Sequence, residues 1–372
     1  MNNLKKHKLL KIFVIIFIVI AVICFAVFLF LTLNPVFGGK ASYDDMKDYQ
    51  KRASNYINNK FVYPSEFEAD GLSEDNRVSK KETTPEDKLP VMDPEISEAL
   101  PIDKYSVTWF GHSTLLIQIH GMNLLIDPVF SQRSSPVSFA GPKRYTEPSL
   151  QISELPHIDA VIISHDHYDH LDMKSVKELD GITDMFIVPL GVENHLERWK
   201  ISSDKIKNMA WWEETQLNGL TIGCTPARHF SNRSLNDNGN TLFASWVFKD
   251  EYHQIFESGD TGYGAHFEKI HEKYGDFDLV LTDCAQYSIN WHEVHMFPEE
   301  AAAACDTLGA KAAMPIHWCA FVLSNHGWDD SAERFTIASE NYDYSVISPM
   351  LCETVTSDDL TEHQERWWRN YN

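Results

Sequence analysis

The sequence is poor in basic residues. In 372 residues, 32 lysines and arginines stand against 54 aspartates and glutamates, which gives a formal net charge of −22. A surface that binds nucleic acid needs clustered lysine and arginine to replace the counterions of the phosphate backbone. We therefore expect no nucleic-acid partner. The remaining composition, 43% apolar and 23% charged, is usual for a globular protein.

Paired cysteines are also lacking. The six cysteines form no CxxC motif and no regular pattern, and a chain of this length does not need a disulfide framework. We expect most of them to be buried thiols. The same interpretation applies to Cys319, although it lies only two residues after a candidate metal ligand, His317.

Long hydrophobic runs are absent except for one near the N-terminus, where residues 12–33 contain no charge. This run can cross a bilayer core of about 30 Å as a helix, whereas the apolar part of a cleaved signal peptide spans only about 7–15 residues. Lysines crowd residues 5–11, so the positive-inside rule places residues 1–11 in the cytoplasm. We expect a retained single-pass anchor in the cell membrane with the remaining chain outside the cytoplasm.

The rest of the chain divides into three parts. Residues 34–100 are charged and show little periodicity, which predicts a stalk or covering segment; residues 101–350 form the main domain, and 351–372 a C-terminal tail. From residue 105, short β-rich runs are split by turns, and later runs alternate with helical stretches at 172–180, 191–199, 264–274 and 298–308. This order predicts two sheets with helices outside them.

One short stretch, "SHDHYDHLD" at residues 164–172, concentrates metal-binding side chains. It follows "DAVIIS", a run typical of a buried strand. His165 and His167 are two residues apart in an extended segment, so both imidazoles can point the same way. Asp169 and His170 follow as the chain turns toward a helix. The pattern predicts two ligand pairs for two neighbouring metal ions, and its nitrogen and oxygen donors suit zinc, with iron or manganese left open.

Further ligands are expected at the ends of other strands. His229, Asp260 and His317 each lie just past an apolar run, where a sheet would present them at a common edge. An aspartate suits a bridging position because its two oxygens can bind one ion each. A hydroxide held between the two ions would then be the nucleophile. The alternative, a polar loop that binds no metal, does not account for all these strand ends.

The seven candidate ligands, in order, resemble the HxHxDH…H…D…H motif of the metallo-β-lactamase superfamily. The stretches "VTWFGHSTLLIQI", "DPVFSQRSSP", "GDTGY" and "IHW" are further similar to the branch of N-acylphosphatidylethanolamine-hydrolysing phospholipase D and its bacterial relatives. The similarity covers roughly residues 100–345. It implies a fold of mixed α/β and α+β class, a four-layer αβ/βα sandwich with two Zn²⁺ at one sheet edge.

The resemblance also implies roles for residues. His165, His167 and His229 would hold one zinc, Asp169, His170 and His317 the other, and Asp260 both. Asp169 would also take a proton from the nucleophile, Tyr168 would face the substrate, and His295 would contact the phosphate or donate a proton. His112, in "FGHST", would support the ligands rather than bind metal.

The implied activity is a phosphodiesterase of phospholipase D type. Its partners would be N-acylphosphatidylethanolamine or a related amphiphilic phosphodiester and the membrane, with a homodimer left open. Two alternatives remain open at this point. A lactonase or other carbonyl hydrolase uses similar ligands on the same fold, and a membrane-tethered scaffold would not be catalytic at all.

Overall fold

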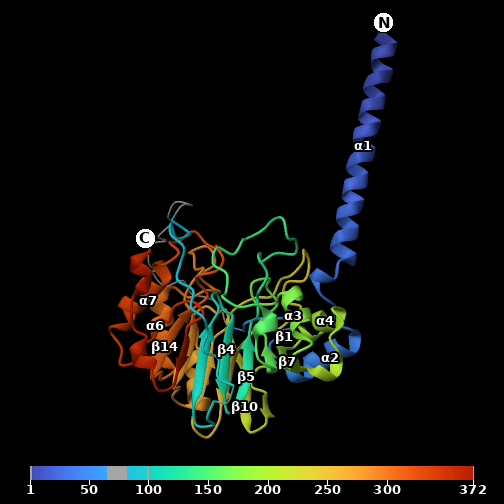
Figure 1. Cartoon of the computed structure of the whole chain (residues 1–372). Helices are drawn as coiled ribbons and strands as arrows, with labels where there is room; N and C mark the ends of the chain where they lie inside the picture. Colours follow the sequence, from blue (N-terminus) through green and yellow to red (C-terminus); the bar gives the residue numbers. More distant parts are fainter. Residues whose placement is uncertain (1, 65–81, 99, 372) are drawn as a thin grey trace.

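Two seven-stranded sheets form the centre of the molecule (Figure 1). The computed structural model describes residues 2–64, 82–98 and 100–371. Residues 65–81, which belong to the charged segment predicted at 34–100, lie outside the described residues. All the candidate site residues are within the described part of the chain.

The first sheet begins with the hairpins expected from the early apolar runs. β3, β4 and β5 pair antiparallel, and β5 to β8 continue as parallel neighbours. The order is β16-β3-β4-β5-β6-β7-β8, with β3 (Tyr105–Trp109), β4 (Leu115–Ile119), β5 (Met122–Ile126), β6 (Ile158–Ile162), β7 (Thr183–Pro189), β8 (Ile206–Met209) and β16 (Thr354–Thr356). The register sets Ile126 opposite Ile162, so β5 and β6 end at the same edge.

The second sheet has the order β15-β14-β13-β12-β11-β10-β9. Its strands are β9 (Glu214–Leu217), β10 (Leu220–Pro226), β11 (Ala244–Lys249), β12 (Gln254–Glu257), β13 (Leu279–Asp283), β14 (Ala312–Ile316) and β15 (Ser345–Val346). β12, β13 and β14 are parallel, with Asp283 opposite Ile316. The residues that follow these strands are therefore brought to one edge.

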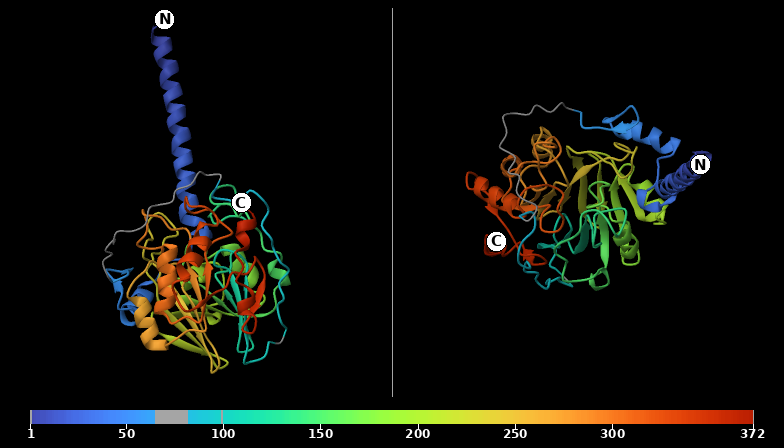
Figure 2. Two further views of the ribbon diagram at one scale, coloured as in Figure 1. Left: turned by 90° about the vertical axis from the view of Figure 1, so that its left-hand side faces the viewer. Right: turned by 90° about the horizontal axis from the view of Figure 1, so that it is seen from above.

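Helices cover the outer face of each sheet (Figure 2). α3 (Met173–Leu179) and α4 (Glu193–Arg198) cover the first sheet, and α5 (His266–Tyr274), α6 (Pro298–Thr307) and α7 (Asp330–Ser339) cover the second. A large apolar core lies between the two sheets, and a smaller one lies under each helical layer. The predicted four-layer sandwich is confirmed.

Short 3-10 turns are η1 (Pro35–Phe37), η2 (Ile152–Glu154), η3 (Ser203–Lys205), η4 (Leu360–Glu362) and η5 (Trp367–Asn370).

The N-terminal region contains one long exposed helix, α1 (Asn2–Leu33), which projects from the sandwich (Figure 1). Within it, Lys6–Leu33 is long and apolar enough to cross a membrane. After η1 come α2 (Tyr43–Arg52) and a small hairpin of β1 (Tyr56–Ile57) and β2 (Lys60–Phe61). Tyr49 and Phe61 pack against Leu190, so this part of the segment covers the main domain.

The C-terminal residues also pack into the fold. Trp367 and Trp368 join the core between the sheets, and the ring of Trp367 stacks on Trp318 with centroids 5.5 Å apart. Of the six cysteines, all free, Cys24 on α1 is exposed and the other five are buried, as expected from the sequence.

Candidate metal centre

The predicted ligands meet at the edge where strands of both sheets end. His165, His167, Asp169 and His170 follow β6 of the first sheet. The second sheet contributes three residues: His229 after β10, Asp260 after β12 and His317 directly after β14. Residues separated by up to 152 positions in the sequence, from 165 to 317, thus face one another across the sandwich.

His165, His167, His229 and Asp260 form one group, whose ligand atoms all lie within 4.8 Å of one another. Nε2 of His229 lies 3.2 Å from Nδ1 of His167. Oδ2 of Asp260 lies 3.7 Å from Nε2 of His165 and 3.8 Å from Nε2 of His229. These are the spacings of donors that converge on one cation.

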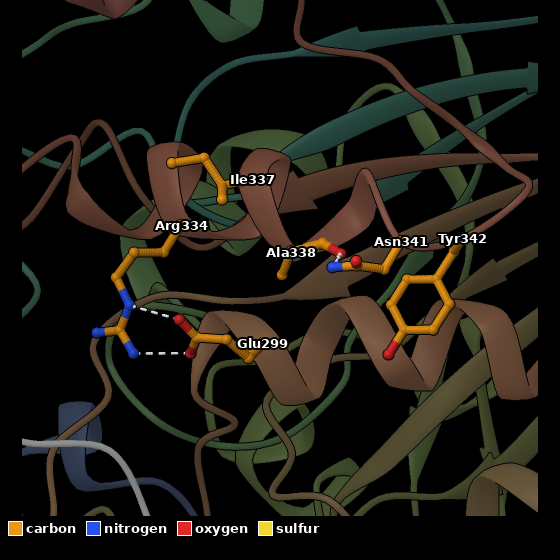
Figure 3. A pocket seen from close by; sticks show the side chains of 6 residues that line it. All are labelled: Glu299, Arg334, Ile337, Ala338, Asn341 and Tyr342. Carbon is orange, nitrogen blue, oxygen red and sulfur yellow. Dashed lines mark hydrogen bonds and ion pairs between the residues drawn. The ribbon is translucent and has the colours of Figure 1, made fainter.

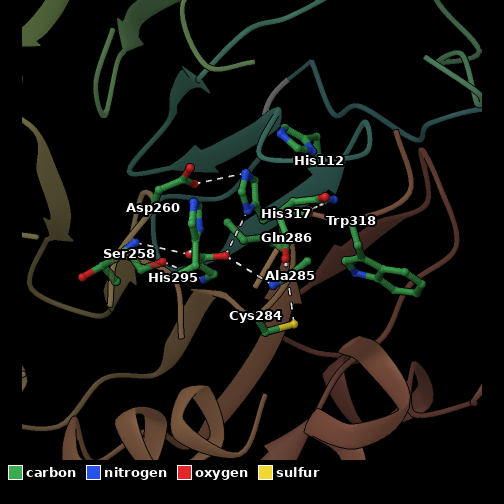
Figure 4. A network of polar contacts seen from close by, with 12 residues as sticks. His112, Ser258, Asp260, Cys284, Ala285, Gln286, His295, His317 and Trp318 are labelled. Carbon is green, nitrogen blue, oxygen red and sulfur yellow. Dashed lines mark hydrogen bonds and ion pairs between the residues drawn. The ribbon is translucent and has the colours of Figure 1, made fainter. Parts of the chain in front are cut away.

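The other oxygen of Asp260 faces a second group. Oδ1 lies 3.1 Å from Nε2 of His170 and 3.3 Å from Nε2 of His317, a contact visible in Figure 4. Oδ2 of Asp169 lies 3.5 Å from each of the same two nitrogens. One carboxylate therefore has an oxygen toward each group, which is the arrangement a bridging ligand requires.

His112 belongs to this second group, because its Nε2 lies 2.9 Å from Oδ2 of Asp169. Its backbone is in the left-handed region with φ 56°, as is that of His317 with φ 73°. Backbone hydrogen bonds join His112 to His317 and its neighbour Trp318: His317 N donates to His112 O at 3.0 Å, and His112 N donates to Trp318 O at 2.6 Å. Non-glycine residues held in this conformation are typical of functional sites.

Carboxylates behind the ligands orient the imidazole rings. Nδ1 of His170 donates to Asp127 at 2.7 Å, and Nδ1 of His317 donates to Asp283 at 3.0 Å. Nδ1 of His229 donates to the carbonyl of Val294 at 3.0 Å. Because Nδ1 donates in each pair, Nε2 is the nitrogen that faces the centre and is available to a cation once any proton on it has left.

The sequence interpretation did not single out Asp127 and Asp283. Each stands at the end of an apolar strand, "NLLID" and "DLVLTD", as Asp260 stands just after one. This position at the end of an apolar strand is the feature of the sequence by which both aspartates could have been identified. Their partners, 43 and 34 residues away, depend on strand register and could not be derived from the sequence pattern.

Protonation follows from burial and from the neighbouring charges. Burial, reinforced by the charge of neighbouring imidazoles, keeps the pKa of His165 and of His229 well below the usual value. Burial opposes ionisation of Asp260, but the charges of His170 and His317 outweigh it and hold its pKa well below the usual range. The first group thus offers neutral imidazole and ionised carboxylate, the forms that bind cations.

His317 has the opposite shift. Burial lowers its pKa, but the carboxylates of Asp260 and Asp283 outweigh burial and raise the pKa to about 10. The pKa of His170 is also raised, because Asp260, Asp169 and Asp127 together outweigh its burial. These two rings therefore hold protons that a bound cation would replace.

The buried atoms of the cluster fit metal ions. Nε2 of His165 is buried and has no hydrogen-bond partner among the described residues, although it points into the first group. Burying such an atom without a partner costs free energy, which a metal–nitrogen bond would recover. The donor set of histidine nitrogens and aspartate oxygens, with no cysteine, suits zinc and other first-row divalent metals.

The two predicted substrate residues lie beside the cluster. The ring of His295 stacks on that of His317 with centroids 5.4 Å apart, and its Nδ1 lies 3.1 Å from Asp283 (Figure 4). The hydroxyl of Tyr168 donates to the carbonyl of Arg233 at 2.8 Å, and the guanidinium of Arg233 covers its ring. Substrate contact by His295 and Tyr168 stays a prediction.

A hollow between α6 and α7 offers no comparable chemistry (Figure 3). Its volume is about 290 Å³, and the ion pair of Arg334 with Glu299, with N–O distances of 2.8 and 2.7 Å, lies along one side. Neither residue belongs to a group of candidate metal ligands among the described residues. The strand-end cluster is therefore the candidate active site.

Comparison with known proteins agrees with this geometry. A family model described as a beta-lactamase superfamily domain matches residues 122–318, more than half of the chain. The chain belongs to the metallo-β-lactamase superfamily. It is a metal-dependent hydrolase of that fold, with the two His/Asp groups as its candidate metal sites.

Relatives within the superfamily differ in what is known of them. An uncharacterized protein of Mycobacterium tuberculosis is 41% identical over 286 residues, which cover 76% of each chain. The N-acyl-phosphatidylethanolamine-hydrolyzing phospholipase D 1 of Caenorhabditis elegans is 36% identical over 223 residues, covering 57% of this chain and 63% of its own. A solved metallo hydrolase from Ignicoccus hospitalis has a TM-score of 0.53 at 20% identity, covering 68% of this chain and 98% of that one, and supports the fold alone.

Proposed function

We propose that the protein is a membrane-anchored di-zinc phosphodiesterase of phospholipase D type. It would act on N-acylphosphatidylethanolamine or a related amphiphilic phosphodiester. The observation that carries the proposal is the placement of Asp260, with one carboxylate oxygen toward His165 and His229 and the other toward His170 and His317. A pair of ions bridged by one carboxylate is the arrangement that favours in-line displacement at phosphorus.

In this proposal the three histidines of the first group hold one zinc, and Asp169, His170 and His317 hold the other. When bound, the ions supply a nucleophile from water near neutral pH and polarise the phosphoryl oxygens. The protein supplies the rest. Asp127 and Asp283 hold His170 and His317 in the tautomer that leaves Nε2 free for binding.

Proton transfer is assigned to two residues. Oδ2 of Asp169 is engaged by His112, so its other oxygen is the one proposed to take the proton of the attacking water. The P–O bond to the N-acylethanolamine breaks as the new P–O bond forms, which leaves phosphatidic acid. His295 is proposed to give the departing oxygen its proton, and Tyr168 is proposed to line the path of the substrate.

The anchor supports an amphiphilic substrate. α1 leaves the sandwich at the end where loop 128–150 rises, on the side of the strand-end cluster (Figure 1). Phe139 in that loop is 81% exposed, and Leu235, beside the foot of α1, is 78% exposed. Apolar side chains at the end nearest the bilayer would bring the site to its substrate, with the domain on the extracytoplasmic side.

The test uses the full-length protein in vesicles that contain N-acylphosphatidylethanolamine. Release of N-acylethanolamine is measured by mass spectrometry, and hydrolysis of a soluble phosphodiester and of a lactone is measured in parallel. We expect both phosphodiesters to be cleaved in preference to the lactone, and the Asp260→Ala variant to cleave neither. A preference for the lactone would move the chemistry to carbon, and no hydrolysis by the metal-loaded protein would favour the non-catalytic scaffold.

A further inference from the structure

The segment that follows α1 contacts α4 and Arg233, and through them it reaches the loop of metal ligands. Figure 1 shows the lower end of α1 beside α4, and the contacts are polar. Arg198 donates to the carbonyl of Leu33 at 3.0 Å, and Nε1 of Trp199 donates to the carbonyl of Pro35 at 2.6 Å. The chain after the anchor is thus attached to the domain rather than a free linker.

His195 on α4 connects this segment to the ligand loop. The backbone N–H of Gly39 donates to Nδ1 of His195 at 3.0 Å, so Nδ1 is an acceptor and the ring proton lies on Nε2. Nε2 faces Oδ2 of Asp166 at 3.3 Å. Asp166 lies between two candidate ligands, His165 and His167, and is 1% exposed.

Arg233 makes a second connection between the same parts. Its Nε donates to the carbonyl of Val36 at 2.9 Å. Its Nη1 donates to the carbonyls of Asp166 and Leu171, at 2.6 and 2.8 Å, and these two carbonyls lie at the two ends of the turn that carries Asp169 and His170. Because Arg233 is 3% exposed, these bonds are not weakened by water.

Two glycines make the close approach feasible. A Cβ on Gly39 would lie 1.9 Å from the carbonyl oxygen of Asn194, and one on Gly38 would lie 2.0 Å from Nδ1 of His195. Gly38 also has φ 76°, which other residues rarely adopt. No other residue type would fit at either position without moving the segment.

We propose that residues 34–39 form part of the scaffold of the metal site, with His195 and Arg233 as positioning residues that transmit their placement to the loop 165–171. The inference rests on the proposed metal site but not on the proposed substrate. The hydrogen bonds predict that displacing the segment loosens the ligands, as expected for partners behind a metal ligand. The anchor itself, residues 2–33, would hold the protein at the membrane without contributing to metal binding.

The test measures zinc affinity of the full-length protein in detergent by competition with a chromophoric chelator. Gly39→Ala should weaken binding at least about tenfold. Gly181→Ala is the matched control, because a Cβ there meets nothing within 4 Å, and its affinity should not change. Circular dichroism and the Tm of each variant confirm that it is folded.

A second pair keeps the inference testable if Gly39→Ala fails to fold. His195→Ala removes both contacts, whereas His195→Gln retains an N–H where Nε2 donates to Asp166. We expect the alanine variant to lose at least about tenfold in zinc affinity and the glutamine variant to recover most of the loss. His271→Ala, at an exposed histidine that pairs with Asp276, is the control.

Two results would overturn the inference. One is zinc binding by Gly39→Ala and His195→Ala as tight as that of the unmodified protein. The other is a glutamine variant as weak as the alanine variant, which would show that the contact with Asp166 does not transmit the effect. Absence of zinc binding by the unmodified protein would instead contradict the proposed function, so the two failures are distinguishable.

Discussion

Oδ1 of Asp283 lies 3.0 Å from Nδ1 of His317, and this contact determines which nitrogen of the ring faces the candidate metal centre. The other oxygen of Asp283 contacts His295 at 3.1 Å. One buried carboxylate therefore orients both a proposed ligand and a proposed proton donor. The effect of Asp283 on metal binding by His317 and its effect on proton donation by His295 can be measured separately.

Asp283→Asn should weaken binding of the metal held by His317 by about 10–100-fold, because an amide is a poorer acceptor than a carboxylate for the Nδ1 proton. Metal affinity is measured by chelator competition. Asp276→Asn is the matched control, since Asp276 pairs with His271 at 2.8 Å on the surface and belongs to no group of candidate metal ligands among the described residues. Equal loss in both variants would show that removing a carboxylate charge, rather than the contact with His317, is responsible.

Asp260→Ala should remove the ligand shared by the two groups. Hydrolysis of a soluble phosphodiester should fall to background, and the bound metal should drop below that of any single-histidine variant, because both sites lose a donor. Metal content is measured by elemental analysis after gel filtration. Retained activity with two bound metals would contradict the bridging role.

Metal binding should release protons. In the metal-free protein the carboxylates that surround His317 raise its pKa to about 10, although burial opposes this, and the pKa of His170 is raised in the same way. The ring of His317 is then protonated at pH 8, and a metal ion must displace its Nε2 proton, so we expect at least one proton released per chain. Calorimetry in two buffers of different ionisation enthalpy measures the number, and zero release would contradict the proposed use of these nitrogens.

The sign of the accompanying change in stability can also be tested. A pKa raised on folding contributes stability that is fully present below the unfolded value of 6.5 and is lost as the pH rises toward 10. The metal-free protein should therefore lose free energy of unfolding between about pH 7 and 10 through His317, and the raised pKa of His170 acts in the same direction. Urea unfolding at several pH values checks this, and the metal-loaded protein, whose rings carry no displaceable proton, should show a smaller change.

Trp367→Ala should destabilise the protein by about 3–5 kcal/mol, because it leaves a cavity in the core between the sheets. Trp367 is 2% exposed and stacks on Trp318, next to His317. Trp212→Ala is the control, since Trp212 is 37% exposed. A similar small loss in both variants, measured by chemical unfolding, would show that the C-terminal residues are peripheral to the core.

The sequence was sufficient to locate the main strands and the converging ligands, for a physical reason. Apolar runs such as those ending before Ser164 and His317 form strands buried on both faces, and parallel strands bring the residues that follow them to one edge. The edge strand β9 was not predicted, because its burial merely alternates between exposed and half-buried. α7 was not predicted either, and its apolar residues are few.

Contacts between distant segments were less accessible from the sequence. Residues 34–100 were predicted to be a stalk or covering segment because they show little periodicity, yet Ser42 and Asp45 form a capping box that starts α2, and Tyr49 on that helix is buried. The capping pattern was present in the sequence and could have been used. The contact between Gly39 and His195 joins positions 156 residues apart, and only the folded chain reveals it.

The central claim is that two metal ions, bridged by Asp260, perform hydrolysis. The most direct measurement is the metal content of the purified full-length protein, determined in the same samples as its hydrolysis of a soluble phosphodiester, before and after chelation and after zinc is restored. We expect about two ions per chain, loss of activity in step with loss of metal, and recovery with zinc. One ion or none in fully active protein would contradict the account.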